Sequence, residues 1–274
     1  MKYEIRKRED GKVAIFDENG NMISPQWFDW IWSFGLVDGH SKYYEAKKNE
    51  KWAIFDVNGK MISPGWFDGV SSYGLVFGQS RYYVAEKYRK KAIFDENGKQ
   101  ISQWYDYIEP YGLVKGQSPY YLAREDYKEA IFDEKGNMIT PQWFDYVSIE
   151  GLVWGQSLYY IAKKNKKYAI FDVYGNRITD WFDYISSDGL VRGECDYYMA
   201  CNKDKCAVYH KDGKKVSDDI SRNYVKEADK IVFDENLGIV EMFDENENLV
   251  KTIEFNPVIR RKEEFLDYTK LLNI

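Results

Sequence analysis

Histidine and cysteine are scarce in this sequence, with two His and three Cys among 274 residues. The chain also lacks a Gly-x-Ser-x-Gly elbow and a phosphate-binding glycine-rich loop, so the motifs of common hydrolases and nucleotide enzymes are absent. We therefore expect no enzyme activity, no catalytic residue and no cofactor. No apolar run approaches the length of a membrane span, and residues 1–7 lack the hydrophobic core of a signal peptide. A membrane location is not expected.

The three cysteines, Cys195, Cys201 and Cys206, lie in one short segment. A secreted disulfide protein would distribute paired cysteines through its units, so this pattern favours a reducing, cytoplasmic location. The spacing matches no common zinc site, and we expect no bound metal. The formal net charge of −6 argues against nucleic acid as an obligatory partner.

Aromatic residues, in contrast, make up 18% of the chain, which is far too much apolar surface for a disordered protein. Many of them belong to an internal repeat with an Ala-Ile-Phe-Asp core. The core begins at Ala14, Ala53, Ala92, Ala130 and Ala169, at intervals of 39, 39, 38 and 39 residues, and a decayed copy begins at Ala207. A fixed period of this size indicates a repeat architecture.

One unit of the repeat reads as four short strands, at 159–163, 168–171, 176–179 and 181–185. Asp172 and Gly175 bound a tight turn between the second and third strands, because Asp caps the turn and Gly tolerates a positive φ. No stretch of the repeat has a helical period. The fold class is therefore all-β, built from tandem antiparallel β-meander repeats of about 39 residues.

The first strand of each unit is apolar on both faces, so its sheet must be covered on both faces. Small sheets stacked around an axis achieve this in a β-propeller, and we predict a six-bladed, propeller-like arrangement. An open, twisted stack of β-hairpins is the alternative. The repeat domain is predicted over 1–255, with clear units to about 206, a decayed unit at 207–230 and a terminal hairpin at 231–255. An amphipathic helix is predicted over 256–274, where Asn256 and Pro257 suit its start.

The segment from Lys51 to Pro64 resembles the bacterial WG, or KWG, repeat. The resemblance covers about residues 3 to 215 and includes the later Trp66-Phe67-Asp68 and Gly74-Leu75 segments. The chain departs from the family pattern because Ala replaces the family's Gly in all five copies. The resemblance implies a β-rich interaction module, often an accessory part of a larger bacterial system, and it implies no enzyme activity.

Two repeated sets of polar residues are candidate ligand-binding positions. Carboxylates and amides beside aromatic rings are typical of sites for glycans or small polar ligands. The competing interpretation is structural, because repeated polar residues also pair backbone amides between units or close turns. The candidates are His40, Gln79, Gln117, Gln156, Asp68, Asp106 and Asp145.

Basic residues gather at one hairpin turn of the repeat, while the Asp-Glu turns at the other end of the same strand are acidic. Successive turns of a meander emerge on opposite edges, so the sequence predicts a basic face that docks an acidic partner. Solvated surface turns are the simpler interpretation. The basic candidates are Lys47, Lys48, Lys51, Lys87, Arg89, Lys90, Lys91, Lys163, Lys164, Lys166 and Lys167. The sequence thus favours a binding or scaffold module that recruits a protein partner, with glycan binding as the alternative.

Overall fold

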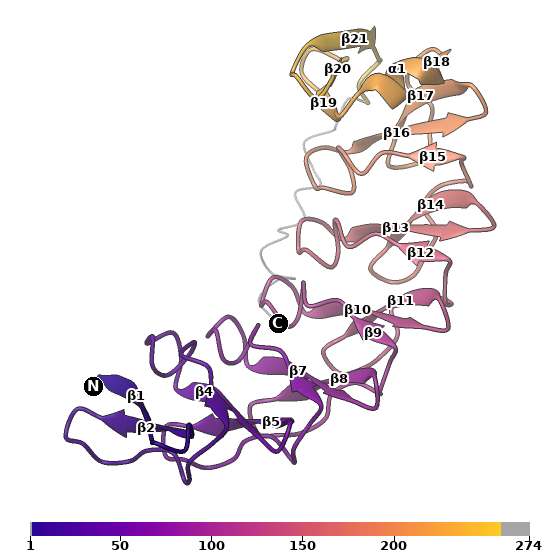
Figure 1. Ribbon diagram of the computed structural model, residues 1–274. Helices are drawn as coiled ribbons and strands as arrows, with labels where there is room; N and C mark the ends of the chain where they lie inside the picture. Colours follow the sequence, from indigo (N-terminus) through magenta and orange to yellow (C-terminus); the bar gives the residue numbers. More distant parts are fainter. Residues whose placement is uncertain (1, 259–274) are drawn as a thin grey trace, which may run out of the picture. The chain divides into compact units, whose positions relative to one another are not determined.

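The computed structural model describes residues 2–258; Met1 and residues 259–274 lie outside the described part. Within that part the chain forms 21 β-strands and one short helix (Figure 1). Every strand pairing is antiparallel. The prediction of an all-β fold made of antiparallel repeats is confirmed. Only the first three residues of the predicted helix over 256–274 are described, and they form no regular structure.

The chain divides into two compact units. The first comprises Met1–Phe182 with Val191–Gly193, and the second comprises Asp183–Leu190 with Glu194–Ile274. The division falls after the fifth Ala-Ile-Phe-Asp copy. The predicted limits of the repeat domain, 1–255, stay a prediction.

The first unit contains one hairpin followed by four three-stranded sheets, which follow one another in chain order (Figure 1). In each sheet a long hairpin carries one additional strand of two residues. The hairpin is β1 (Tyr3–Lys7) and β2 (Val13–Asp17), and the sheets are β3 (Trp30–Ile31), β4 (Tyr43–Lys48) and β5 (Lys51–Asp56); β6 (Gly69–Val70), β7 (Tyr82–Lys87) and β8 (Lys90–Asp95); β9 (Tyr107–Ile108), β10 (Tyr120–Glu125) and β11 (Lys128–Asp133); and β12 (Tyr146–Val147), β13 (Tyr159–Lys164) and β14 (Lys167–Asp172).

The Trp-Phe-Asp segment links each sheet to the next, which corrects the predicted four-stranded meander. Phe67 exchanges two backbone hydrogen bonds of 2.9 Å with Trp52 of the preceding sheet. Two residues later, Gly69–Val70 pair with β7 of the following sheet. The predicted third strand is reduced to single bridges, such as Phe55 to Met61. One extended segment therefore has backbone partners in two sheets and ties neighbouring repeats together.

Both faces of the long hairpins in β4–β5, β7–β8, β10–β11 and β13–β14 are buried, as the apolar pattern predicts. Ile54 on one face of the sheet β3-β4-β5 packs in a cluster with Tyr83 and Phe94 of the next sheet. Tyr44 on the opposite face packs with Ile15 of the first hairpin. Because directly paired residues share a face and successive residues alternate, this register places the hairpin of β4 and β5 between two apolar layers.

The Asp-Gly turns have the predicted structural role. The Oδ1 atom of Asp56 accepts hydrogen bonds from the backbone N–H groups of Asn58 and Lys60, each 2.9 Å long. Gly59 has a φ of 73° and donates its N–H to the Asp56 carbonyl. Asp17, Asp95, Asp133 and Asp172 accept the corresponding bonds. These carboxylates close turns.

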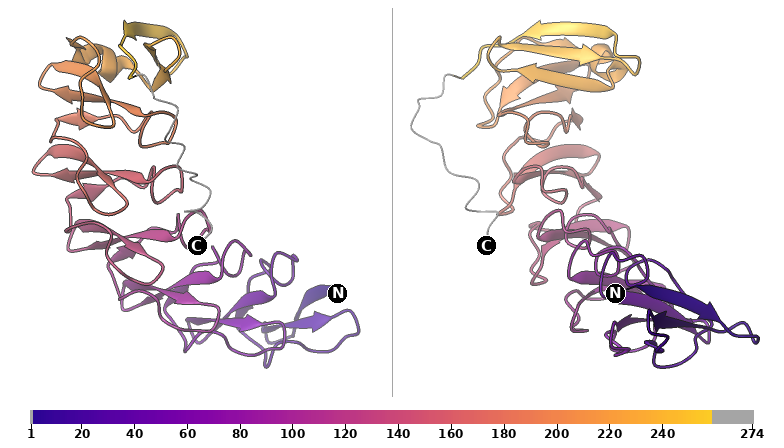
Figure 2. Two further views of the ribbon diagram at one scale, coloured as in Figure 1. Left: turned by 180° about the vertical axis from the view of Figure 1, so that it is seen from behind. Right: turned by 90° about the vertical axis from the view of Figure 1, so that its left-hand side faces the viewer.

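The second unit contains two sheets and a helix, and the right-hand view of Figure 2 shows its last three strands side by side. The predicted terminal hairpin is in fact a three-stranded sheet, and a helical turn that the sequence reading missed lies in the decayed unit. The sheets are β15 (Tyr184–Ile185), β16 (Tyr197–Asn202), β17 (Lys205–His210) and β18 (Ile220–Ser221); and β19 (Lys230–Asp234), β20 (Ile239–Phe243) and β21 (Leu249–Glu254); the helix is α1 (Arg222–Glu227).

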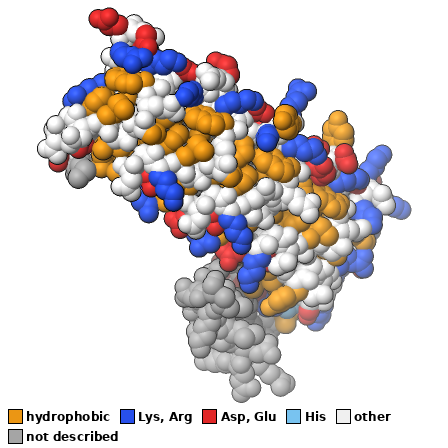
Figure 3. All heavy atoms as spheres, turned by 90° about the horizontal axis from the view of Figure 1, so that it is seen from below, with side chains coloured by type: hydrophobic (Ala, Val, Ile, Leu, Met, Phe, Trp, Pro, Cys, Tyr) orange, Lys and Arg blue, Asp and Glu red, His pale blue; other side chains and the backbone are white. Residues whose placement is uncertain are grey.

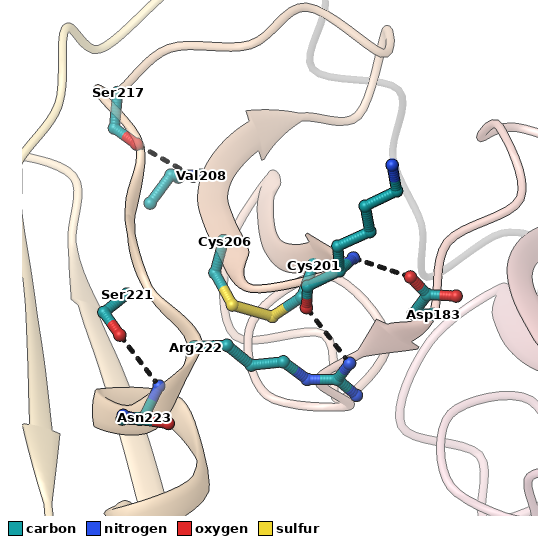
Figure 4. Close-up of a disulfide and its surroundings, with 9 residues drawn as sticks. Asp183, Cys201, Cys206, Val208, Ser217, Ser221, Arg222 and Asn223 are labelled. Atoms are coloured by element: carbon teal, nitrogen blue, oxygen red, sulfur yellow. Dashed lines mark hydrogen bonds between the residues drawn. A yellow bond between two sulfur atoms is a disulfide. The ribbon is translucent and has the colours of Figure 1, made fainter.

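A disulfide joins Cys201 of β16 to Cys206 of β17 (Figure 4). The two residues face each other directly across the hairpin and both are buried. The sequence argument favoured a reducing location and did not anticipate this disulfide. Beside it, Ser221 caps α1 by accepting the N–H of Asn223 at 3.3 Å. The predicted cytoplasmic location stays a prediction.

Candidate binding surface

The second Asp set stabilises hairpin turns. Asp68 Oδ2 accepts the backbone N–H of Tyr88 at 2.7 Å, and its Oδ1 is bonded to the ammonium group of Lys51. Tyr88 and Arg89 have φ values of 52° and 65°, a left-handed conformation that is unfavourable for side chains other than Gly or Asn. The hydrogen bond with Lys51, followed by that with Tyr88, lowers the pKa of the Asp68 carboxyl. The carboxylate thus holds a strained turn in place.

The same arrangement recurs in neighbouring repeats. Asp106 accepts the N–H of Asp126 at 3.0 Å, and Asp145 accepts the N–H of Asn165 at 2.8 Å. The ligand candidates Asp68, Asp106 and Asp145 therefore lie at hairpin turns, and each already has protein partners. Their proposed role in ligand binding stays a prediction, while their structural role is directly visible.

The glutamine candidates lie in loops that stack on one another. Gln117 Oε1 accepts the N–H of Gly112 at 3.0 Å, which closes the loop between β9 and β10. A Cβ added to Gly116 of this loop would lie 2.3 Å from the carbonyl oxygen of Gln79 in the preceding loop. Gln79 and Gln156 close their loops in the same way, and the carbonyl of His40 lies equally close to Gly78. The four candidates form one column of stacked loops.

Several of the basic candidates face hydrogen-bond acceptors within the chain. Lys47 pairs with Glu50 at 2.7 Å, and Lys90 is bonded to Glu125. Lys164 donates to Gln142 at 2.7 Å. Asp68, Asp106 and Asp145, which accept hydrogen bonds from these hairpin turns, lie at this same edge. The sequence analysis did not predict these Asp residues there. On the face that Figure 3 shows, basic and acidic side chains are both scattered around patches of hydrophobic ones. The hairpin edge is therefore of mixed charge. Docking of a partner stays a prediction for all of the basic candidates, which are Lys47, Lys48, Lys51, Lys87, Arg89, Lys90, Lys91, Lys163, Lys164, Lys166 and Lys167.

The sequence reading missed a row of exposed aromatic rings in the first unit. Trp30, Trp32, Phe34 and Tyr73 are each between 39% and 50% exposed. The row crosses from one repeat to the next, since the Phe34 and Phe77 rings meet edge to face at 5.2 Å. We call it the aromatic stripe. Trp30 and Trp52 both contact Trp32, and from there the stripe continues through Phe34, Phe77, Tyr73, Lys115, Tyr111 and Trp154.

Lys115 contributes a cation to the aromatic stripe. The ammonium nitrogen of Lys115 lies 4.5 Å from the ring centroid of Tyr73 and 3.7 Å from that of Tyr111, which are cation–π distances. In the next repeat an ion pair of 2.6 Å between Glu150 and Arg192 occupies the corresponding loop positions. The period-two alternation of Trp30, Trp32 and Phe34 was the available sequence signal.

A buried carboxylate lies beside this stripe. Glu45 of β4 is 1% exposed, and its Oε1 atom has no hydrogen-bond partner among the described residues. Burial raises the pKa of the Glu45 carboxyl to about 7, and the nearby Ser72 hydroxyl partly opposes the shift. A buried polar atom without a partner is costly and uncommon, so Glu45 requires an explanation.

Residues 2–258 contain no group of three or more His, Cys, Asp and Glu side chains arranged to hold a metal ion. Among the same residues, no helix is long and apolar enough to cross a membrane.

The chain matches no protein-family model and no curated protein sequence. Among solved structures it is similar to a eukaryotic initiation factor, with 10% identity, a TM-score of 0.38, and coverage of 92% of this chain and 84% of that one. It is also similar to Hsv2p of Kluyveromyces lactis, with 12% identity, a TM-score of 0.35, and coverage of 89% and 79%. A third is the β-propeller domain of Cps50 (Swd1) from Myceliophteria thermophila, with 12% identity, a TM-score of 0.29, and coverage of 94% and 93%. Because all three TM-scores lie below 0.5, we base neither fold nor function on these similarities.

Proposed function

We propose that this chain is a non-enzymatic binding module that recruits a protein partner through the aromatic stripe. The continuity of the stripe across four repeats carries the proposal. Large exposed apolar patches on soluble proteins mark interaction sites, and Trp and Tyr dominate the binding energy of protein interfaces. Lys115 and the mixed charges nearby favour a partner surface without strong net charge. The aromatic stripe is therefore a better-supported docking surface than the basic turns.

We also propose the architecture and biological setting that the sequence predicts. The repeats form a six-bladed, propeller-like arrangement, with an open twisted stack of hairpins as the alternative. Burial of both sheet faces in the first unit supports either arrangement. The chain is a divergent relative of the KWG repeat family, acts in the cytoplasm, and serves as an accessory subunit of a larger bacterial system. Nucleic acid is not an obligatory partner.

The protein-binding proposal is tested with two matched triple variants. The stripe variant carries Trp32→Asn, Phe77→Asn and Tyr111→Asn. The control variant carries Tyr88→Asn, Tyr127→Asn and Tyr174→Asn, which replace three tyrosines that are more than 75% exposed and lie outside the stripe. A protein captured by the wild-type chain is purified and titrated by calorimetry against all three chains.

We expect the stripe variant to weaken binding at least tenfold and the control variant to change it less than twofold. Circular dichroism and a thermal melt check that both variants are folded. Equal affinity of a folded stripe variant and the wild-type chain would contradict the proposed function.

Glycan binding is the second candidate, and one observation favours it. Each loop glutamine uses its Oε1 atom to close the loop, and no described residue accepts from its Nε2 group, so an amide donor recurs in each of these loops. Glu194 closes the corresponding loop of the fifth repeat with a carboxylate. Gln117→Glu should therefore preserve the loop and remove the donor. Glycan-array binding that Gln117→Glu abolishes would support this candidate, and an array without binding would exclude the glycans tested.

A further inference from the structure

Glu45 occupies a position that is aliphatic in the other repeats. Corresponding residues of the paired hairpins are Val84, Leu122, Ile161 and Met199, and all four are buried. Four other repeats therefore form the same hairpin without a carboxylate at this position. A charged group that the fold does not need, kept where it is costly, is a candidate functional residue.

The surroundings of Glu45 are as unusual as the residue itself. Trp32 donates its backbone N–H to the Glu45 carbonyl at 3.2 Å, so the two side chains project from the same sheet face. The Trp32 ring stacks on Trp52, with centroids 6.3 Å apart and planes 12° from parallel, and the Trp30 ring meets it edge-on at 5.8 Å. Three tryptophans therefore share one sheet face with a buried carboxylate at the end of the stripe.

This tryptophan cluster occurs in a single repeat. The residues that correspond to Trp32 are Ser71, Glu109 and Ser148, and those that correspond to Trp52 are Lys91, Glu129 and Tyr168. The carboxylate and the tryptophans coincide in the same sheet, which links the two departures from the repeat pattern.

Lys47, a basic side chain on this face, has its ion pair with another carboxylate rather than with Glu45. Lys47 lies two residues further along the strand, on the same face. Its ammonium nitrogen lies 5.8 Å from the Trp52 ring centroid and pairs with Glu50 at 2.7 Å. A cation stacked on Trp52 is therefore compatible with the site, while Glu45 Oε1 is left without a donor from the described chain.

We propose that Glu45, Trp30, Trp32 and Trp52 form a subsite for an arginine side chain of the partner protein. A guanidinium group is planar, stacks on indole rings and donates two parallel hydrogen bonds to a carboxylate, whereas an ammonium group does not stack. Its positive charge would compensate the buried Glu45 carboxylate. Entry requires the half-exposed Trp32 side chain to move, and exposed side chains change rotamer within nanoseconds. This inference rests on the proposed function, since the subsite lies at one end of the aromatic stripe.

The test uses the full chain and two small probes, N-acetyl-arginine amide and its uncharged isostere N-acetyl-citrulline amide. Indole N–H resonances are followed by NMR in the wild-type protein, Glu45→Gln and Glu45→Val. Val is the residue that the next repeat uses at this position, so Glu45→Val is expected to fold. The resonance of Trp143, which lies outside the subsite, is the internal control.

We expect the arginine probe to shift the signals of Trp30, Trp32 and Trp52 saturably. Citrulline should bind at least tenfold more weakly, and both variants should lose at least tenfold in affinity for the arginine probe. Absence of a saturable shift, or equal binding by folded Glu45→Gln, would overturn the inference.

The outcome is separable from that of the proposed function. If the arginine probe fails to bind but the purified partner still requires the stripe, the subsite is wrong and the docking function stands. If the probe binds through Glu45 but the partner is insensitive to the stripe variant, the subsite is supported and protein docking through the stripe is wrong.

Discussion

Ionisation of Glu45 should make the folded chain less stable as the pH rises. The Glu45 carboxyl has a pKa of about 7 in the folded protein and an ordinary value of 4.5 in the unfolded chain. Between these values the folded state holds a proton that the unfolded state has released, so stability falls as pH increases through this window. One pKa unit corresponds to about 1.4 kcal/mol, so the full loss is roughly 3 kcal/mol, with about 2–3 kcal/mol of it between pH 5 and pH 8.

Glu45→Gln removes this ionisation and isolates its effect. Urea unfolding of the wild-type protein and the variant is measured by tryptophan fluorescence at pH 5 and pH 8. Relative to the variant, the wild-type protein should lose about 2–3 kcal/mol of unfolding free energy on going to pH 8. A difference between the two proteins that does not change with pH would refute the reasoning.

Glu129→Gln is the matched control, because this second buried glutamate is fully partnered. Its carboxylate pairs with Arg124 at 2.6 Å and accepts the N–H of Val147 at 2.8 Å. Breaking a buried, hydrogen-bonded ion pair is destabilising. We therefore expect Glu129→Gln to lower stability at pH 8, opposite in sign to Glu45→Gln. If both substitutions changed the unfolding free energy equally at pH 8, burial of the carboxylate would determine its effect on stability and its pairing would not.

Three further predictions concern the repeat fold. Tyr83→Phe should leave the melting temperature unchanged or raise it, because its buried hydroxyl has no partner in the described part of the chain; Tyr82→Phe, which loses a 3.2 Å bond to a glutamate, should lower it slightly. Gly116→Ala should destabilise far more than Gly20→Ala in urea unfolding: both have positive φ, but only the first Cβ would meet the preceding loop, at 2.3 Å, and equal costs would contradict loop stacking. Trp143→Ala should cost about 3 kcal/mol, since its half-buried ring contacts two core rings, and an unchanged melt would assign it a surface role.

Local patterns predicted much of the fold. The Ala-Ile-Phe-Asp core fixes the register of each hairpin, because Ala and Phe alternate with Ile across a pleated strand. The Asp56-to-Gly59 turn follows from a carboxylate that caps backbone amides and a residue that tolerates positive φ. These features depend on residues that are close in sequence, so one copy of the repeat is enough to predict them.

Features that depend on contacts between repeats were not predictable in the same way. The Trp-Phe-Asp segment looked like a strand of its own unit, yet Gly69–Val70 pair with the next sheet. Asp68 looked like a ligand because its partner Tyr88 lies 20 residues away. Ser221 and Asn223 start a helix too short to show a period.

The candidate site was missed for a related reason. Averaging over the repeats emphasises what the copies share, whereas Trp32 and Glu45 matter because they differ from their counterparts. The alternation of aromatic residues near Trp32 was visible in the sequence, but its continuity with Phe77 and Tyr111 requires the stacking of loops.

Photocrosslinking tests most directly whether the aromatic stripe is the docking surface. A benzoylphenylalanine at position 77, in the stripe, is compared with one at position 88, on an exposed hairpin turn outside it. In the purified complex, the residue at 77 should crosslink to the partner and the residue at 88 should not. Crosslinking from 88 alone, with both proteins folded and bound, would contradict the proposed docking surface.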